Sequence, residues 1–202
     1  MMTVAGVILA AGRSARMAPR NKLLETIGRQ PIIARVAEVA LASGVKPVVV
    51  VTGFEAQRIA EALRGLDVAC VHNPDFDAGL GTSVGAGLAA IPVDCDGALV
   101  LLGDMPFVEA GDLAVLIAAF VAKDRNSICV PVRHGRIGNP VLWGRAHFPE
   151  LMNLSGDAGG KRLLEVHRER VTEVEVASDG IFADVDTGFD LARLKRQAER
   201  ES

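Results

Sequence analysis

Residues 3–17, TVAGVILAAGRSARM, join an apolar run to a loop of small and basic residues. A short apolar run bounded by turn residues is typical of a buried β-strand, so we expect a strand over residues 3–9. The run ends at Ala10, Ala11 and Gly12. Small residues let a loop backbone approach a ligand and turn its N–H groups toward phosphate oxygens. This stretch therefore predicts a buried strand that leads into an anion-binding loop.

The rest of the chain alternates short β-branched runs with longer helical patterns. Residues 47–52, PVVVVT, are typical of a strand that is covered on both faces of its sheet. The alternation favours a mostly parallel sheet between two layers of helices. No linker or repeat interrupts it, so we expect a single three-layer α/β/α, Rossmann-like domain over residues 1–202. Further strands are expected over residues 68–72, 98–102, 127–132, 141–143 and 171–176, and helices over residues 31–43, 55–64, 82–90, 109–122, 145–152, 160–167 and 189–200.

Composition excludes two classes of partner. The 202 residues carry a net charge of −3, and half of them are apolar. A general nucleic-acid binder needs a basic surplus to neutralise phosphates, so no nucleic-acid partner is expected. Because neither a secretion signal nor a membrane-spanning run is apparent, we expect a cytoplasmic protein with no membrane partner.

The cysteines and histidines do not indicate a metal site. The three cysteines form no CxxC pair and lie in or near apolar runs. We expect them to be small buried side chains in a reducing compartment, with a cysteine nucleophile or metal ligand as the alternative. The four histidines show no metal-binding spacing and are expected to be structural or at the surface. These residues are Cys70, Cys95, Cys129, His72, His134, His147 and His167.

Polar and glycine-rich residues directly follow four of the expected strands. Residues 12–14 follow the first strand, residues 52–53 the second, Asn73 the third and residues 103–104 the fourth. The carboxyl ends of parallel strands meet at one edge of the sheet, and ligands of open α/β sheets bind outside that edge. We therefore expect a ligand site there.

The first of these loops is rich in cations. Arg13, Arg16 and Lys22 lie within ten residues of one another, and Ser14 is between them. With the preceding small residues they form a cradle suited to a triphosphate. The segment is neither a P-loop nor a GxGxxG fingerprint. The alternative is a solvated loop with incidental basic residues.

Two acidic segments contain candidate magnesium ligands. Asp104 follows a buried strand, and Mg²⁺ is held in proteins by few carboxylates together with phosphate oxygens. Asp184 and Asp186 alternate along an extended segment and so share a face, and Asp186 would be a second ligand if the fold brings it to Asp104. The alternative for both positions is capping of the helix that follows.

Two glycine-bearing loops complete the set of candidates. Residues 73–87, NPDFDAGLGTSVGAG, include Gly81 and Ser83 and suit close contact with a base or ribose at a helix start. Residues 156–162, GDAGGKR, open a helix next to two cations. This second loop is our candidate for contact with a second, phosphorylated substrate.

Together these segments resemble the molybdenum cofactor nucleotidyltransferase family, and most of all its cytidylyltransferase branch. LAAGRSARM with NKLL is similar to the nucleotide-binding signature of that family, and NPDFDAGLGTSVGAGL to its base-and-ribose loop. GDMP is similar to its metal-binding turn, and GNPVLW, GDAGGKRLL and DVDTGFDL to three further blocks. The blocks occur in order over nearly the whole chain.

The resemblance implies a fold of the nucleotide-diphospho-sugar transferase type and Mg²⁺-dependent transfer of CMP from CTP to the phosphate of molybdopterin. A molybdenum-containing oxidoreductase would receive the product. Lys22 and Arg16 would stabilise phosphate charge, and Asp104 and Asp186 would bind Mg²⁺. The catalytic residues would be Arg16, Lys22 and Asp104. The nucleotide would be held by Leu9, Ala10, Ala11, Gly12, Arg13, Ser14, Lys22, Gly53, Asn73, Gly81 and Ser83.

The nucleotide and the acceptor have alternatives. The guanylyl branch carries Gly-Gly where this chain has Ala10 and Ala11, so the added methyl groups favour cytosine. The alternatives are GTP, another acceptor such as a sugar or polyol phosphate, and a carrier of the cofactor without catalysis. The chain departs from the family at Ala18 and Gly188, where glycine and proline are usual. The first departure would alter the loop near the triphosphate.

Overall fold

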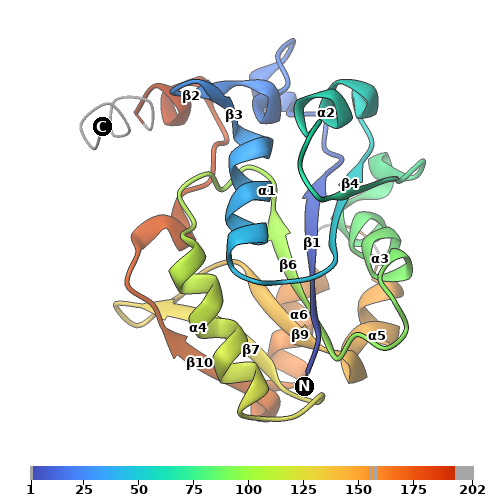
Figure 1. The fold of residues 1–202 in the computed structure, drawn as a ribbon, viewed down its shortest axis with the longest axis vertical. Helices are drawn as coiled ribbons and strands as arrows, with labels where there is room; N and C mark the ends of the chain where they lie inside the picture. Colours follow the sequence, from blue (N-terminus) through green and yellow to red (C-terminus); the bar gives the residue numbers. More distant parts are fainter. Residues whose placement is uncertain (1, 155, 157–158, 194–202) are drawn as a thin grey trace.

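The computed structural model describes residues 2–154, 156 and 159–193 of the chain (Figure 1). Its main element is a mixed sheet with the strand order β10-β7-β9-β6-β1-β4-β5, to which β8 is added through β7. A separate ribbon pairs β2 with β3. The strands are β1 (Val4–Ala10), β2 (Thr26–Ile27), β3 (Gln30–Pro31), β4 (Val48–Thr52), β5 (Ala69–His72), β6 (Gly97–Leu102), β7 (Ile128–Arg133), β8 (Arg136–Ile137), β9 (Val141–Gly144) and β10 (Val171–Glu175).

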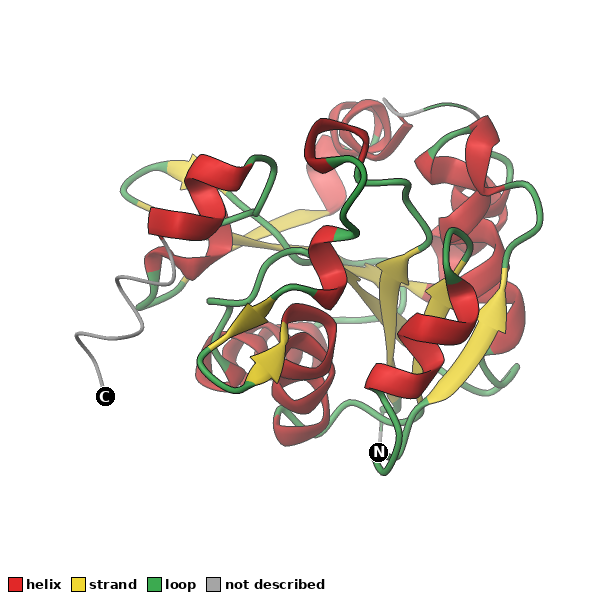
Figure 2. Ribbon diagram, turned by 90° about the horizontal axis from the view of Figure 1, so that it is seen from above, coloured by secondary structure: helices red, strands yellow, loops and turns green. Residues whose placement is uncertain are grey.

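Helices cover both faces of the sheet, as Figure 2 shows from above. Helices α1, α2 and α4 contribute to the core on one face, and α3, α5 and α6 to the core on the other. Within the described part of the chain, no helix is long and apolar enough to cross a membrane. The helices are α1 (Ile32–Ala42), α2 (Ala56–Ala62), α3 (Leu80–Ala90), α4 (Ala110–Val121), α5 (Phe148–Met152) and α6 (Gly159–Val166).

The central strand β1 contributes side chains to both cores. Ile8 and Ala10 lie in the core beneath α1, whereas Val7 and Leu9 lie in the core beneath α3. Successive side chains of a strand point to opposite faces, so a strand whose seven residues are all buried must be covered on both sides. The expected three-layer fold with a mostly parallel sheet is confirmed.

Strand β9 runs in the opposite direction to its neighbours. β1 pairs in parallel with β4 and β6, whereas β9 is antiparallel to both β6 and β7. Because β9 is reversed, its first residue, Val141, pairs with Val100 near the carboxyl end of β6. Asn139, two residues before Val141, is thereby brought to the edge toward which the parallel strands point.

The helix expected over residues 145–152 is a 3₁₀ turn, Arg145–His147, followed by α5. The other expected elements within the described residues agree with the structure to within about two residues at their ends, as for β1 and α1. The ribbon of β2 and β3 and the strand β8 were not expected, because each strand is two residues long. Residues 188–193 are helical, and the remainder of the helix expected over residues 189–200 lies outside the described residues.

The cysteines differ in burial. Cys95 and Cys129 are buried as expected, but Cys70 is exposed, and the expectation was wrong there. Cys70 lies on β5, which forms an edge of the sheet and is largely exposed. Burial raises the pKa of the Cys129 thiol to about 11. That thiol therefore stays protonated near neutral pH and is no thiolate nucleophile.

Candidate active site

The loop after β1 is fixed by hydrogen bonds from two neighbouring loops. The N–H of Gly103 donates to the carbonyl oxygen of Leu9 over 3.0 Å, and the N–H of Phe54 donates to that of Ala11 over 3.0 Å. A Cβ at Gly103 would lie 2.8 Å from the Leu9 oxygen, so this close approach requires glycine. The carboxyl ends of β1, β4 and β6 are thereby held together at one edge, the edge that faces the viewer in Figure 2.

Ser14 links this loop to the segment that carries Lys22. Ser14 has a left-handed backbone conformation with φ 52°, and its hydroxyl donates to Oδ1 of Asn21 over 3.4 Å. The N–H of Lys22 donates to the same hydroxyl over 3.2 Å, and the N–H of Leu23 donates to Oδ1 of Asn21 over 3.1 Å. The backbone at Lys22 is therefore fixed against the end of β1.

Lys22 lies between two carboxylates. Its Nζ is 2.5 Å from Oδ2 of Asp104 and 3.1 Å from Oδ1 of Asp186. The side chains of Lys22 and Asp104 are only 16% and 19% exposed, so this charge pair is partly shielded from water. Burial opposes the charged form of Lys22, but attraction and hydrogen bonds from both carboxylates outweigh it and raise the pKa of Lys22.

The main chain brings the two carboxylates together although 82 positions separate Asp104 from Asp186. The N–H of Val185 donates to the carbonyl oxygen of Asp104 over 2.9 Å, and the Val185 side chain is fully buried. Because side chains alternate along an extended segment, a buried Val185 turns Asp186 outward to Lys22. Arg16 also pairs with Asp186.

Neither carboxylate caps a helix, which was the alternative that the sequence left open. Helix α4 has Glu109 at its N-cap, with no side-chain hydrogen bond to its first turn. After Asp186, the N–H and hydroxyl of Thr187 both donate to Asp190, over 2.8 and 2.7 Å. Asp104 and Asp186 are instead joined through Lys22.

These groups line a cavity of about 360 Å³. Oδ1 of Asp104 is buried there and has no hydrogen-bond partner among the residues that the structure describes. An unpaired buried polar atom costs about 1–3 kcal/mol, and a cation in the cavity would remove that cost. Carboxylate oxygens are the ligands of hard divalent cations, so the donor set fits such an ion. The cavity is lined by Leu9, Gly12, Ser14, Ala15, Arg16, Lys22, Leu23, Leu80, Leu102, Asp104 and Asp186.

Arg13 points away from this cavity, so the expected group of three cations is divided. Its guanidinium forms two hydrogen bonds to Asp77, of 2.6 and 2.5 Å. It also lies 5.6 and 5.1 Å from the ring centroids of Phe54 and Phe76. The hydrogen bond from Arg13 lowers the pKa of the Asp77 carboxyl. Arg13 therefore joins the loop after β1 to the loop before α3.

The expected nucleoside residues in the loop before α3 hold that loop together. The Asn73 amide donates to Oγ1 of Thr82 over 2.9 Å and to Oγ of Ser83 over 3.0 Å, and its oxygen accepts from the N–H of Asp75. A Cβ at Gly53 would lie 2.6 Å from a Phe76 ring carbon. Asn73, Ser83 and Gly53 thus set the shape of the loop, and none of them lines either of the cavities described here.

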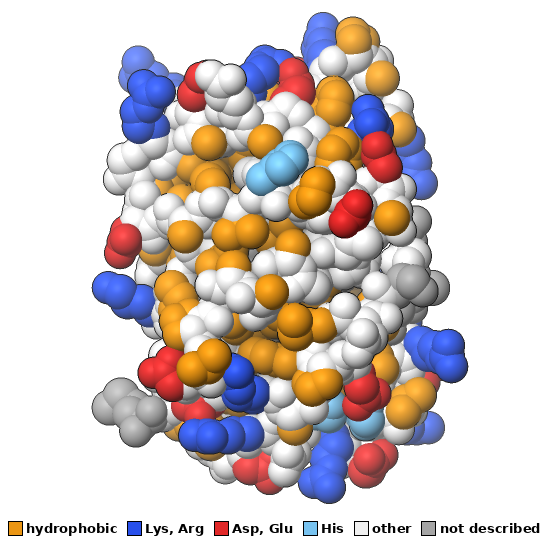
Figure 3. Space-filling model, turned by 90° about the vertical axis from the view of Figure 1, so that its right-hand side faces the viewer, with side chains coloured by type: hydrophobic (Ala, Val, Ile, Leu, Met, Phe, Trp, Pro, Cys, Tyr) orange, Lys and Arg blue, Asp and Glu red, His pale blue; other side chains and the backbone are white. Residues whose placement is uncertain are grey.

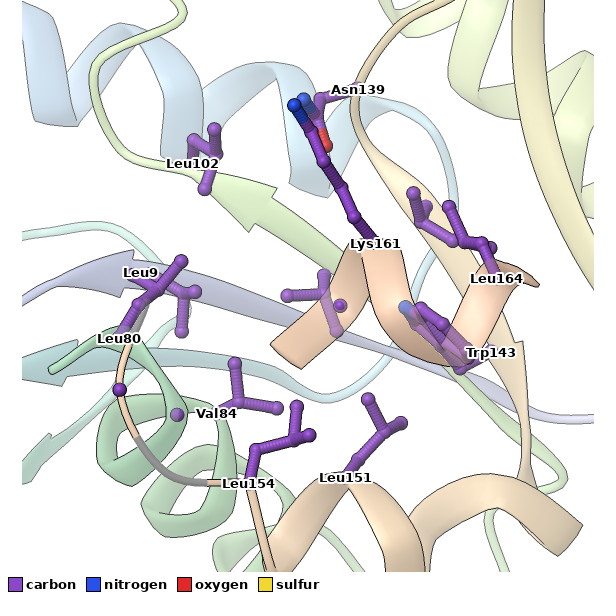
Figure 4. A pocket seen from close by; sticks show the side chains of 15 residues that line it. Leu9, Leu80, Val84, Leu102, Asn139, Trp143, Leu151, Leu154, Lys161 and Leu164 are labelled. Atoms are coloured by element: carbon purple, nitrogen blue, oxygen red, sulfur yellow. The ribbon is translucent and has the colours of Figure 1, made fainter. Parts of the chain in front are cut away.

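A second cavity, of about 210 Å³, adjoins the first and is mostly apolar (Figure 4). The two cavities share three leucines, at positions 9, 80 and 102. At the rim, the side chain of Lys161 extends toward Asn139. Figure 3 shows the side of the molecule with α3 and α5, where hydrophobic side chains gather across the middle. The second cavity is lined by Leu9, Leu80, Gly81, Val84, Val100, Leu102, Asn139, Val141, Trp143, Leu151, Leu154, Gly156, Gly160, Lys161 and Leu164.

The second cavity contains residues that sequence reasoning did not assign to a site. Asn139 and Trp143 belong to the quoted block GNPVLW. The reversal of β9 brings Asn139 to the carboxyl edge, whereas Trp143 pairs with Ala98 near the amino end of β6. From the candidate acceptor loop, Gly156 and Lys161 line the cavity, whereas residues 157–158 lie outside the described residues.

Comparison with known proteins identifies related sequences and folds. Residues 6–172 match the family model of the MobA-like NTP transferase domain. The bifunctional protein GlmU of Leifsonia xyli is 41% identical over 117 residues, which are 56% of this chain and 24% of that protein. The chain spans 24 to 31% of the length of the first curated relatives that it matches.

Solved structures share the fold over nearly the whole chain. A nucleotidyl transferase from Methanothermobacter superposes with a TM-score of 0.87 at 25% identity, and the match covers 99% of both chains. Rv0371c from Mycobacterium tuberculosis, solved in complex with manganese, gives a TM-score of 0.79 at 29% identity. That match covers 96% of this chain and 98% of Rv0371c.

Proposed function

The chain belongs to the MobA-like NTP transferase family and is a nucleotidyltransferase, and from that premise we propose that it transfers CMP from CTP to the phosphate of molybdopterin. Pyrophosphate is the second product. The observation that carries the proposal is the pair of adjoining cavities, one charged and one apolar, at the carboxyl edge of the sheet. A molybdenum-containing oxidoreductase would receive the product.

The charged cavity is assigned to the triphosphate. Asp104 and Asp186 would hold a divalent cation, proposed to be Mg²⁺, which neutralises charge on phosphate oxygens when bound. The manganese complex of Rv0371c supports the use of a divalent metal. Arg16 and Lys22 line the same cavity and would stabilise the negative charge that moves onto pyrophosphate.

The transfer itself is written as an in-line displacement. An oxygen of the acceptor phosphate attacks the α-phosphorus of CTP and forms the new O–P bond. The bond between the α-phosphorus and the oxygen bridging to the β-phosphate breaks, and its electron pair leaves with pyrophosphate. Such a step needs positioning and charge neutralisation more than a covalent nucleophile. Lys22 would supply part of the neutralisation, since its raised pKa leaves the ammonium group protonated at neutral pH.

The apolar cavity is assigned to the acceptor. A flat heterocycle such as a pterin gains from burial against Trp143 and the leucines, whereas a sugar would need polar partners for its hydroxyl groups. Lys161 and Asn139 lie at the rim, where the acceptor phosphate would face the charged cavity. The shared leucines are the boundary across which the two substrates would meet.

The choice of nucleotide rests on Ala11 more than on Ala10. Ala10 belongs to the hydrophobic core beneath α1, so its methyl group is already packed. Ala11 directly follows β1 and is also buried, at 4% exposed, but it belongs to neither of the two core clusters. The methyl group of Ala11 is therefore the one proposed to narrow the space beside the base and favour CTP over GTP.

The proposal is tested by pyrophosphate release with CTP, GTP, ATP and UTP in turn, with Mg²⁺ and with or without molybdenum cofactor. We expect release with CTP only when the cofactor is present. Release with GTP would contradict the role of Ala11, and release with sugar or polyol phosphates alone would contradict the acceptor. Binding of CTP without any release would favour a carrier.

A further inference from the structure

A second group of titratable side chains lies on the face of the sheet covered by α5 and α6, toward the amino end of β7 and away from the charged cavity. It consists of His147, Glu150 on α5, and His167 directly after α6. One possible ligand atom from each residue lies within 4.8 Å of those of the other two. His147 contacts Asn126, which precedes β7, so the group lies toward the amino end of that strand. We call it the His147 cluster.

A hydrogen bond to the backbone fixes the tautomer of the buried histidine of the cluster. Nε2 of His147 is 2.9 Å from the carbonyl oxygen of Asn126. A carbonyl oxygen can only accept a hydrogen bond, so Nε2 carries the proton and Nδ1 carries the lone pair. Metal-bound histidines are typically fixed by such a bond from the second ring nitrogen to a backbone carbonyl. His147 is only 4% exposed, so packing also restricts its ring.

The other two residues add a nitrogen and a carboxylate. Nε2 of His167 lies 3.0 Å from both carboxylate oxygens of Glu150, and the His147 and His167 rings are 4.7 Å apart between centroids. A salt bridge between Glu150 and His167 explains two of the three groups but not the second imidazole beside them. Ligands of a tetrahedral Zn²⁺ lie roughly 3.3 Å apart, given bonds of about 2.0–2.1 Å, so a small closing of the cluster would suffice.

We propose that the His147 cluster binds a Zn²⁺-type transition-metal ion through two imidazoles and one carboxylate, with a solvent molecule as the fourth ligand. Two nitrogens and one carboxylate are a common ligand set for Zn²⁺, and the half-exposed Glu150 leaves access for solvent. The ion would replace the proton that His167 shares with Glu150. This proposal does not depend on the proposed function.

The ion would connect two helices that form the apolar cavity. Helix α5 contributes Leu151 to the cavity wall, and α6 contributes Lys161 and Leu164. Trp143, also in that wall, lies edge-on to His147 with ring centroids 6.2 Å apart. A bound metal would therefore stabilise the arrangement of the acceptor cavity without contacting a substrate there.

The test uses Co²⁺ as the probe on full-length, chelator-treated protein. Trp143 is the single tryptophan of the chain, so quenching of its fluorescence reports a paramagnetic ion bound nearby. We expect saturable quenching at one Co²⁺ per chain, the visible absorption of tetrahedral Co²⁺, and a rise in Tm when Zn²⁺ is added. No saturable quenching and no absorption would overturn the proposal.

Variants locate the site. A substitution of the buried His147 could disturb the fold, so the test uses Glu150→Gln and His167→Ala, whose side chains are more exposed. Each should lower the affinity for Co²⁺ by roughly 10- to 100-fold. His134→Ala is the matched control, since His134 is 72% exposed in the turn between β7 and β8. Asp104→Asn should leave the quenching unchanged. Wild-type affinity in both Glu150→Gln and His167→Ala would overturn the assignment.

Discussion

The two cavities at the carboxyl edge share part of one wall but differ in the rest. The larger is lined by Lys22, Arg16 and two aspartates, whereas the smaller is lined mainly by leucines, valines and Trp143. In the larger cavity, Lys22 is paired with Asp104 and Asp186 without any ligand bound. The smaller cavity presents mostly apolar surface. Because of this difference, we expect substitutions in the charged cavity to act on turnover and substitutions in the apolar cavity to act on binding of the acceptor.

The largest effect is expected for Asp104→Asn. The amide keeps the size of the side chain but removes the charge that would hold the cation, so kcat should fall about 10²- to 10³-fold. Pyrophosphate release at saturating substrates measures it, and circular dichroism checks the fold. Asp184→Asn is the control, because Asp184 is exposed on the same segment as Asp186 and lies outside both cavities. Unchanged turnover in Asp104→Asn would remove the metal assignment.

Lys22→Met should lower kcat about 10²-fold, because it removes the positive charge from beside the departing pyrophosphate. It also leaves Asp104 and Asp186 facing each other without the ammonium group that joins them. We therefore expect Mg²⁺ to raise Tm more in this variant than in the wild type, which calorimetry measures. An equal Mg²⁺ effect in both proteins would show that Lys22 and the cation do not occupy neighbouring positions.

Lys161→Ala tests whether the two cavities bind different substrates. Loss of one charge-assisted hydrogen bond to the acceptor phosphate should raise the KM for the acceptor about ten-fold, while the KM for CTP stays the same. Arg162→Ala is the matched control, because Arg162 is the adjacent exposed cation on α6 and lines neither cavity. A change in the KM for CTP instead would place Lys161 with the triphosphate.

The smallest effect is expected for Ala11→Gly. Removal of one methyl group beside the base should lower the preference for CTP over GTP by about 1 kcal/mol, or roughly five-fold in the ratio of kcat/KM. Competition between the two nucleotides measures this ratio. Ala10→Gly, which removes a methyl group from the core, should lower Tm and leave the ratio unchanged. The reverse pattern would contradict the proposed roles of these two side chains.

Much of the charged cavity was predictable because it follows from chain order. Gly12, Lys22 and Asp104 come after strands whose buried pattern is plain in the sequence, and parallel strands bring their carboxyl ends to one edge. The position of Asp186 beside Asp104 was open until the structure showed the hydrogen bond of Val185 to Asp104.

The positions of other residues could not be predicted, because they depend on loop shape and strand direction. Arg13 faces Asp77 rather than the charged cavity, because the partner of a loop cation is set by the shape of both loops. Asn139 reaches the edge through the reversed direction of β9, which a four-residue strand does not reveal. His147 and His167 are too far apart in sequence to suggest a cluster, although His147 and Glu150 have the i, i+3 spacing of one helix face.

The central claim is that Asp104 and Asp186 together bind a divalent cation beside the triphosphate. The most direct test is electron paramagnetic resonance of Mn²⁺ at fixed CTP, with wild type, Asp104→Asn, Asp186→Asn and the control Asp184→Asn. We expect a CTP-dependent bound Mn²⁺ in the wild type and the control, and its loss in both Asp104→Asn and Asp186→Asn. Equal Mn²⁺ binding by all four proteins would contradict it.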